Sequence, residues 1–179
     1  MAYQKINWQP LPNKTTPVND GNLNHMDQGI YDSNNKSIIM VGLTDNVTIN
    51  FPATAWQDVL LNFDNIIFKL GDTFTLNSDG SIGVNKDGVR VKVTFGLKIG
   101  SKEYVYPMVY ANKNGSWITT GFQDNTDPNV NANLAVISNL IVEVNKNDFI
   151  RAILKSGATN SQVSVTGTYQ YTYMIAEEI

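Results

Sequence analysis

The sequence predicts an all-β protein, an antiparallel sandwich or barrel, preceded by an extended N-terminal arm and one short α-helix. Over residues 89–99 every odd position is apolar and every even position is polar or glycine, which is the period of a half-buried strand. The same alternation returns over residues 162–175, where valine, tyrosine and isoleucine share one parity. The N-terminal part lacks this period, so two parts of different structure are expected.

The first 22 residues favour an extended arm, because three prolines stand among polar residues and exclude a regular helix. From residue 20 to 33 the pattern changes. An Asp or Asn cap precedes Leu23, Met26 and Ile30, whose spacing of three and four lines up one helical face. A helix this short is not stable alone, so its apolar face is expected to pack on a partner surface or on sister helices.

Strands are expected in the rest of the chain, separated by loops rich in Asn, Gly and Asp. The dipeptides Asp79-Gly80, Asp87-Gly88 and Asn114-Gly115 are typical of turns. Residues 55–63 are ambiguous, and the helical spacing of their apolar side chains predicts a helical turn packed on the sheet. The expected strands are 37–42, 46–51, 66–70, 73–76, 81–84, 89–99, 103–111, 116–122, 134–144, 149–154 and 162–175.

Composition limits the partners and the cellular setting. A length of 179 residues allows one β domain with an appendage. Charged residues make up 16% of the chain and the net charge is -3, so no nucleic acid is expected as a partner. No apolar run reaches the roughly 20 residues of a membrane span, and the first residues lack a secretory signal. We therefore expect that the protein is made in a cytoplasm and does not insert into a membrane. The absence of cysteine excludes disulfides, so tight oligomerisation would supply extra stability.

The chain lacks the residues that catalytic sites usually combine, so we expect no enzymatic activity and no cofactor. There is one histidine, no cysteine and no carboxylate cluster at a motif spacing. The lone His25 is expected to be a surface or interface side chain rather than a metal ligand. Two oxygen-rich sets could hold calcium, although turn formation explains both equally well. These sets are Asp124, Asp127 and Asn129, and Asp72, Asn77 and Asp79.

Tyrosines stand in rows on two of the expected strands. One row is Tyr104, Tyr106 and Tyr110, and the other is Tyr169, Tyr171 and Tyr173. Such rows can fill a core, line a subunit interface or present rings to a saccharide. We favour core or interface, since aromatic residues that bind sugars usually stand singly on loops.

The N-terminal segment carries a motif formed by Trp8, Thr16-Pro17 and the run Asn-Leu-Asn-His-Met-Asp-Gln-Gly-Ile at residues 22–30. This motif resembles the opening segment of many tail, baseplate and head-fibre proteins of bacteriophages. In that family a Trp and a Thr-Pro precede a short Leu-Asn-x-Met-Asp-x-Gly-Ile helix, and the segment anchors the protein to the virion. The resemblance implies attachment to a virion, and does not say whether the head or the tail receives the chain.

A second set of motifs lies at residues 71–74, 80–82, 87–91 and 142–148. Their order resembles that of the strands in tumour-necrosis-factor-like jelly rolls, in which a "dGvyrv" strand and a "v-v-kkGD" strand recur. In the "v-v-kkGD" strand motif, Asn147 stands where glycine is usual. The turn at this position is therefore expected to differ from the turn in the resembled family. The resemblance implies an antiparallel jelly-roll sandwich and a threefold trimer around an apolar axis. Phages use such domains as knobs at the ends of fibres.

Together these patterns predict a non-enzymatic, homotrimeric structural protein on the virion surface of a phage, a head-fibre or decoration protein. Residues 1–35 would form the anchoring arm and helix that bind capsid or tail, and residues 36–179 a jelly-roll knob whose outer loops contact host-cell glycan. The expected anchor residues are Trp8, Pro17, Leu23, His25, Met26 and Ile30. The expected trimer contacts are Tyr106, Tyr110, Tyr169, Tyr171 and Tyr173. The expected host contacts are Asn114, Trp117, Asp124 and Asp127.

Three alternatives stay open at this point. One is a tail or baseplate receptor-binding protein that recognises a cell-surface saccharide. Another is a carbohydrate-active or lectin-like enzyme module, which would need paired carboxylates about 5–10 Å apart in a groove. The third is a cytokine-like signalling ligand, which the sequence disfavours because it shows neither a secretion signal nor an anchor helix.

Overall fold

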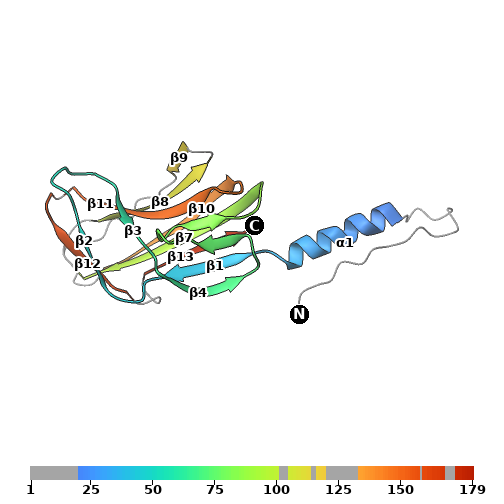
Figure 1. The fold of residues 1–179 in the computed structure, drawn as a ribbon, viewed down its shortest axis with the longest axis horizontal. Coiled ribbons are helices and arrows are strands. Elements are labelled where there is room, and N and C mark those ends of the chain that lie inside the picture. The colour runs from blue at the N-terminus through green and yellow to red at the C-terminus, as the bar shows by residue number, and fades with distance from the viewer. Residues whose placement is uncertain (1–19, 101–104, 114–115, 120–132, 158, 168–171) are drawn as a thin grey trace. The chain divides into compact units, whose positions relative to one another are not determined.

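The computed structural model describes residues 20–100, 105–113, 116–119, 133–157, 159–167 and 172–179. The chain divides into two compact units, Met1–Lys36 and Ser37–Ile179. The first unit contains the helix α1 (Asp20–Asn34), and the second is a β sandwich (Figure 1). An all-β fold with one short helix is therefore confirmed. The predicted arm before the helix lies outside the described residues.

Sheet A has seven antiparallel strands in the described part of the chain. Its order is β2-β12-β7-β13-β1-β4, and β10 pairs with the second edge of β7. Its strands are β1 (Ile38–Gly42), β2 (Val47–Asn50), β4 (Asn65–Leu70), β7 (Val89–Ile99), β10 (Asn133–Val144), β12 (Gln162–Val165) and β13 (Tyr173–Glu178). The long strand β7 lies inside the sheet because its backbone pairs with β13 along one edge and with β10 along the other.

Sheet B has six antiparallel strands among the residues described. Its order is β5-β6-β11-β8-β9, and β3 pairs with β11 beyond the end of β6. Its strands are β3 (Val59–Leu61), β5 (Phe74–Leu76), β6 (Ile82–Val84), β8 (Tyr106–Lys113), β9 (Ser116–Thr119) and β11 (Phe149–Lys155).

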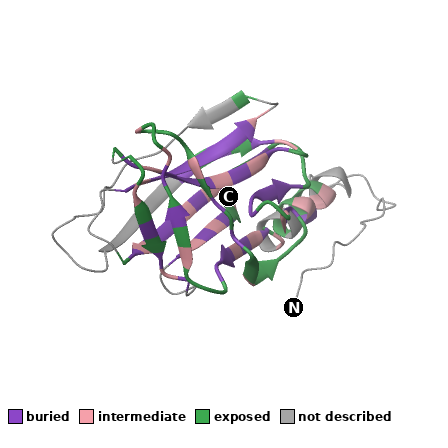
Figure 2. Ribbon diagram, turned by 60° about the vertical axis from the view of Figure 1, so that its left-hand side comes forward, coloured by how far each residue is buried: buried purple, intermediate pink, exposed green. Residues whose placement is uncertain are grey.

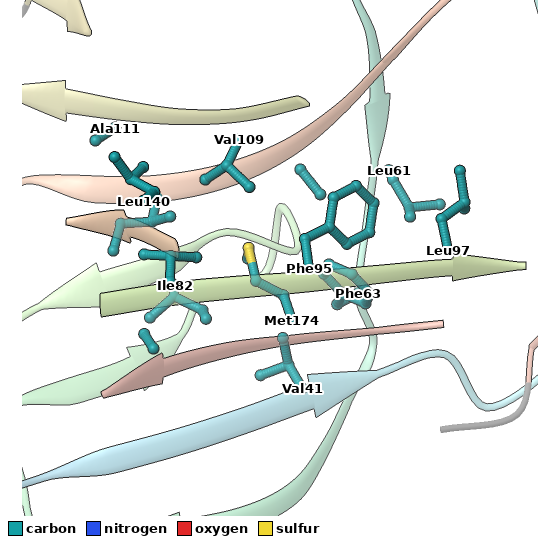
Figure 3. Packing of buried hydrophobic residues seen from close by; sticks show 14 of the residues in the cluster. Val41, Leu61, Phe63, Ile82, Phe95, Leu97, Val109, Ala111, Leu140 and Met174 are labelled. Carbon is teal, nitrogen blue, oxygen red and sulfur yellow. The ribbon is translucent and has the colours of Figure 1, made fainter. Parts of the chain in front are cut away.

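The core lies between the two sheets, and in β7 and β12 every second residue points into it and is buried. Phe95 of β7 and Met174 of β13 face this space from sheet A, and Val109 of β8 faces it from sheet B (Figure 3). The ring of Phe63, in the loop after β3, meets Phe95 edge to face, with ring centroids 6.2 Å apart. Such pairs add to the stabilisation from apolar burial.

The predicted glycine turns have the backbone that they require. Gly80 and Gly88 have φ values of 76° and 63°, in the left-handed region that favours glycine. Asn147, which stands where glycine is usual in the resembled motif, also has a positive φ of 72°. Asparagine tolerates this conformation better than other residues with a Cβ, so the turn before β11 keeps the glycine-type backbone without glycine. The third predicted turn, Asn114-Gly115, lies outside the described residues.

The predicted helical turn over residues 55–63 is wrong. Residues 59–61 form β3, which pairs with Ala152–Leu154 of β11. The strand β6 covers only the first two residues of β11, so the backbone groups farther along that edge need another partner and β3 supplies it. Trp56 and Leu60 belong to the helical pattern, but both side chains are exposed.

The single strand predicted over residues 162–175 is also wrong, because this segment contains β12 and the start of β13. Val163 and Val165 are buried, whereas in β13 the buried residues are Met174 and Ala176, at the opposite parity. Gly167 follows the end of the first strand, β12. A Cβ at this position would lie 1.8 Å from the carbonyl oxygen of Asp45, so the backbone passes too close to another loop for a side chain.

Candidate functional site

The outer face of sheet A carries a row of apolar side chains. Residues that pair across two strands lie on the same face of a sheet. In β1, Val41 is buried in the core, which places its neighbour Met40 on the outer face. Met40 pairs with Phe68 of β4 on one side and with Ile175 of β13 on the other. The row therefore crosses three adjacent strands.

The most exposed members of this face lie on β4 and β10. Phe68 and Leu70 are 51% and 56% exposed, and Ile141 is 52% exposed. Figure 2 colours each residue of the ribbon by its burial, and almost all of β4 belongs to the exposed class. Between β13 and β10 the face is continued by half-buried Lys92 and Thr94 of β7. Several large apolar side chains exposed on one face usually mark an interaction site. The sheet A face is defined here as Ile38, Met40, Phe68, Leu70, Ile141, Tyr173 and Ile175.

Tyr173, one of the five predicted trimer contacts, lies on the sheet A face. It pairs with Gly96 of β7 and is half-buried. A Cβ on Gly96 would lie 2.6 Å from Cε1 of Tyr173, so the tyrosine ring lies directly over this glycine. Glycine at this position is what allows the ring to lie flat on the sheet.

The structure does not bring the other described tyrosines to this face. Tyr106 and Tyr110 are on β8, in sheet B. The hydroxyl of Tyr110 donates to Oδ1 of Asp58 over 3.3 Å, and the ring of Tyr106 lies 5.0 Å from that of Trp56. Both tyrosines therefore contact the segment that leads into β3. Tyr169 and Tyr171 lie outside the described residues.

The apolar members of the sheet A face were not singled out in the sequence. Phe68 belongs to the run Ile66-Ile67-Phe68, which is typical of a strand buried on both sides. Its exposure follows from the place of β4 at the end of sheet A, which the strand pattern does not reveal.

The predicted anchor residues are described in part. Leu23, Met26 and Ile30 lie on α1 at the predicted spacing. Leu23 is half-buried, whereas Met26 and Ile30 are 64% and 45% exposed. His25 is also exposed. Trp8 and Pro17 lie outside the described residues, so the helix alone represents the predicted anchor in the structure. No helix in the described residues combines the length and apolar character needed to cross a membrane.

The predicted host contacts are largely outside the described residues. Asn114, Asp124 and Asp127 are not described. The backbone of Trp117 lies in β9, where it pairs with Asn112 of β8. These residues stay predictions.

The described residues contain no group of three acidic or histidine side chains that could hold a metal ion. In the candidate set of Asp72, Asn77 and Asp79, the Asp79 carboxylate accepts hydrogen bonds from the amide and hydroxyl of Ser81 and forms an ion pair with Arg151. The hydrogen bond from the Ser81 hydroxyl is the main cause that lowers the pKa of Asp79. Its carboxylate thus closes the turn before β6. The other set lies outside the described residues.

Glu178, near the end of β13, is hydrogen-bonded to Ser37, the first residue of the second unit. Its carboxylate accepts hydrogen bonds from the Ser37 amide and the Thr73 hydroxyl, and lies 2.5 Å from Nζ of Lys86. Burial raises the pKa of Glu178, but the hydrogen bonds from Lys86, Ser37 and Thr73 together outweigh it and hold the pKa below its ordinary value.

A pH-dependent contribution to stability follows from this lowered pKa. The contribution is fully present above the ordinary pKa of 4.5 and is lost as the pH falls through the folded-state pKa. We expect Glu178→Gln to lower the free energy of unfolding by about 1.5 kcal/mol at pH 7. The difference from the wild type should shrink at pH 3. Urea unfolding at both pH values measures it.

Glu177→Gln is the matched control, because Glu177 is the exposed neighbour on the same strand. It should change the free energy of unfolding by less than about 0.5 kcal/mol. An undiminished Glu178→Gln effect at pH 3 would contradict the assigned role of the ionised carboxylate.

Two antiparallel sheets packed face to face, with β7 and β13 in one and β8 and β11 in the other, define a jelly-roll sandwich. More narrowly, the fold is of the tumour-necrosis-factor type. Murine APRIL at pH 5.0 aligns with a TM-score of 0.62 and 11% identity, over 80% of this chain and 99% of that one. Eiger TNF from S. frugiperda gives 0.57 and 13%, over 80% and 91%. The globular domain of zebrafish complement 1qA protein gives 0.51 and 13%, over 79% and 95%.

Sequence comparison adds no relative to these structural neighbours. No protein-family model matches the sequence, and no curated protein shows significant sequence similarity to it. At the identities found, the structural likeness shows the fold alone. The predicted jelly-roll sandwich is confirmed, and the function must be argued from the surfaces of this chain.

Proposed function

We propose that the protein is a non-enzymatic, homotrimeric structural protein of a phage virion, a head-fibre or decoration protein. Its N-terminal segment anchors it to the particle, and its jelly-roll knob projects from the virion surface toward the host. The observation that carries the self-association is the sheet A face, with its exposed Phe68, Leu70 and Ile141. The phage origin is inferred from the N-terminal sequence motif.

Trimerisation accounts for the sheet A face. Tumour-necrosis-factor-like jelly rolls, which the sequence resembles, form trimers around an apolar axis. Each fully buried large apolar side chain stabilises an interface by about 1.5–3 kcal/mol, so a few such residues per subunit have a large combined effect. Because the chain has no cysteine, subunit association is also the expected source of extra stability.

The helix α1 supports the proposed anchor. Its Met26 and Ile30 side chains are exposed, so they are available to an apolar surface on the particle. A trimer would present three anchors at one place. Linked weak attachments act together through effective concentration, and the combined attachment exceeds that of one segment.

Removing residues 1–36 should abolish incorporation into phage particles and leave a folded trimer. The boundary follows the division between the two compact units. Immunoblots of purified particles, produced with either the full or the shortened chain, measure incorporation. Sedimentation of the shortened chain measures its oligomeric state.

A milder test keeps the full chain and replaces Met26 and Ile30 by serine. We expect reduced incorporation, while Gly29→Ala is the control, because a Cβ at this helix position meets nothing within 4 Å. Particles that carry the shortened chain at the wild-type level would show that the anchor lies elsewhere. Imaging of labelled particles would distinguish head from tail.

A tail or baseplate receptor-binding protein is the second candidate function. It is favoured by one observation, the exposed Trp56 ring beside Tyr106 and Asp58 on sheet B. Aromatic rings beside polar groups are suited to saccharide recognition, which this candidate requires.

A further inference from the structure

We propose that the outer face of sheet B binds a neutral hexopyranose, with Trp56 and Tyr106 as the stacking platform and Asp58 as the hydrogen-bond acceptor. The inference deepens the receptor-binding candidate and rests on it. It requires only the folded knob, and it is independent of the virion anchor.

The aromatic platform is formed by two segments that are far apart in the sequence. Trp56 precedes β3, and Tyr106 is the first residue of β8. Their ring centroids are 5.0 Å apart, with an angle of 51° between the planes. The Trp56 ring also lies over Gly157, where a Cβ would be 3.0 Å from Cζ2. The two rings are therefore in contact and inclined to one another.

Trp56 is held with its ring exposed by an uncommon backbone. Its φ is 66°, in the left-handed region that bulky residues seldom adopt, and 53% of the residue is exposed. The Trp56 amide donates to the carbonyl of Ser156 over 2.9 Å, which fixes the turn against the loop after β11. The Trp56 ring is thus held in a solvent-exposed position before any ligand binds, which makes it a preorganised contact surface. Backbone strain of this kind often accompanies binding sites.

Polar groups of the right kind stand beside the platform. Lys155 of β11 pairs in register with Tyr106 and places Nζ 2.8 Å from Oδ1 of Asp58. The same oxygen accepts from the hydroxyl of Tyr110. Within the described residues, Oδ2 of Asp58 and the indole N–H of Trp56 have no hydrogen-bond partner. One acceptor and one donor are therefore available to ligand hydroxyl groups.

The chemistry of these groups selects a neutral sugar. The C–H bonds on one side of a pyranose ring carry partial positive charge, which the negative face of an aromatic ring attracts. The carboxylate accepts from hydroxyl groups that lie beside that side of the ring. Lys155 already forms an ion pair with Asp58, so among the described residues beside the platform no uncompensated cation is present for a sialic acid or a sulfated sugar.

The test uses the full chain and defined sugars. Lactose, cellobiose and methyl α-mannoside are titrated separately, with sialyllactose as the anionic comparison. Saturation-transfer-difference NMR reports which ligand protons lie against the protein, and tryptophan fluorescence reports the affinity. We expect saturable, millimolar binding of at least one neutral sugar, with the strongest transfer to the protons on one side of its ring.

Three variants assign the binding to this site. Trp56→Ala and Trp56→Phe should weaken binding at least about tenfold and about threefold, respectively, because they remove or shrink the stacking surface. Asp58→Asn should also weaken it, since a neutral amide is the poorer acceptor. Leu60→Ala is the matched control, because Leu60 is exposed at 40% on β3 but has no aromatic ring or hydrogen-bonding group. Circular dichroism and sedimentation confirm that each variant stays folded.

Several results would overturn the proposal. Wild-type protein that binds none of the neutral sugars lacks the site, and binding unaffected by Trp56→Ala places it elsewhere. Tighter binding of sialyllactose than of lactose contradicts the selection of a neutral ligand. None of these results affects the trimer or the anchor, which are measured by sedimentation and by particle incorporation.

Discussion

Replacing Phe68 by aspartate is expected to convert the proposed trimer into monomers. The side chain is 51% exposed in the single chain and lies on the edge strand β4 of the sheet A face, paired with Met40 of β1. The substitution removes about 2 kcal/mol of apolar burial per subunit and places an unpaired carboxylate in the interface, which costs still more. Sedimentation equilibrium over a range of concentrations should show at least a hundredfold weaker association, since each 1.4 kcal/mol corresponds to about a factor of ten.

The control for this experiment is Leu60→Asp. Leu60 is also exposed, at 40%, but it lies on β3 in sheet B, so the same new charge falls outside the proposed interface. Ile141→Asp tests the face independently from β10. A Phe68→Asp protein that stays trimeric, or a wild type that is monomeric at micromolar concentration, would remove the basis for the proposed assembly.

The two proposed surfaces are compatible because they belong to different sheets. The sheet A face is covered when subunits associate. The Trp56 and Tyr106 platform lies on the outer face of sheet B, on the other side of the core. A trimer of this kind would leave three platforms accessible. Repeated weak sugar sites on one particle would bind a cell surface more strongly than one site.

The sequence predicted those elements whose local pattern matches their environment. The strand β7 begins and ends where its alternation does, at Val89 and Ile99, because one face meets the core along its whole length. The helix α1 follows its apolar spacing, and the turns at Gly80 and Gly88 follow their dipeptides. In each case a short stretch of sequence contains all the information that the element needs.

The predictions that are wrong concern residues whose environment is set by distant parts of the chain. Trp56 suggested a helical face, but its ring is placed by Tyr106, fifty positions away in the sequence. The proposed binding site also contains Asp58, which directly precedes β3, and Lys155, the last residue of β11. These two residues meet because β3 pairs with β11. Spacing within one segment cannot reveal such a site, because strand pairing creates it.

The replacement of Gly80 by alanine is expected to be the most destabilising single change considered for the knob. Gly80 has a φ of 76°, which costs an alanine about 1 kcal/mol. A Cβ there would also lie 2.5 Å from both Cα of Asn62 and the amide nitrogen of Phe63. These are backbone atoms that cannot rotate away, and displacing them moves Phe63, whose ring is packed edge to face on Phe95 in the core. Overpacking of this kind adds about 1–3 kcal/mol.

Gly88→Ala separates these two causes. Gly88 has a similar φ of 63°, but a Cβ there meets nothing within 4 Å, so only the backbone cost of about 1 kcal/mol is expected. For a chain of this size each kcal/mol lowers the melting temperature by about 2–4 °C. At one fixed protein concentration, the melting temperature should therefore fall by about 4–16 °C for Gly80→Ala and by about 2–4 °C for Gly88→Ala. Equal losses would mean that the turn can shift away from Asn62, and that the close approach of the two loops does not constrain the fold.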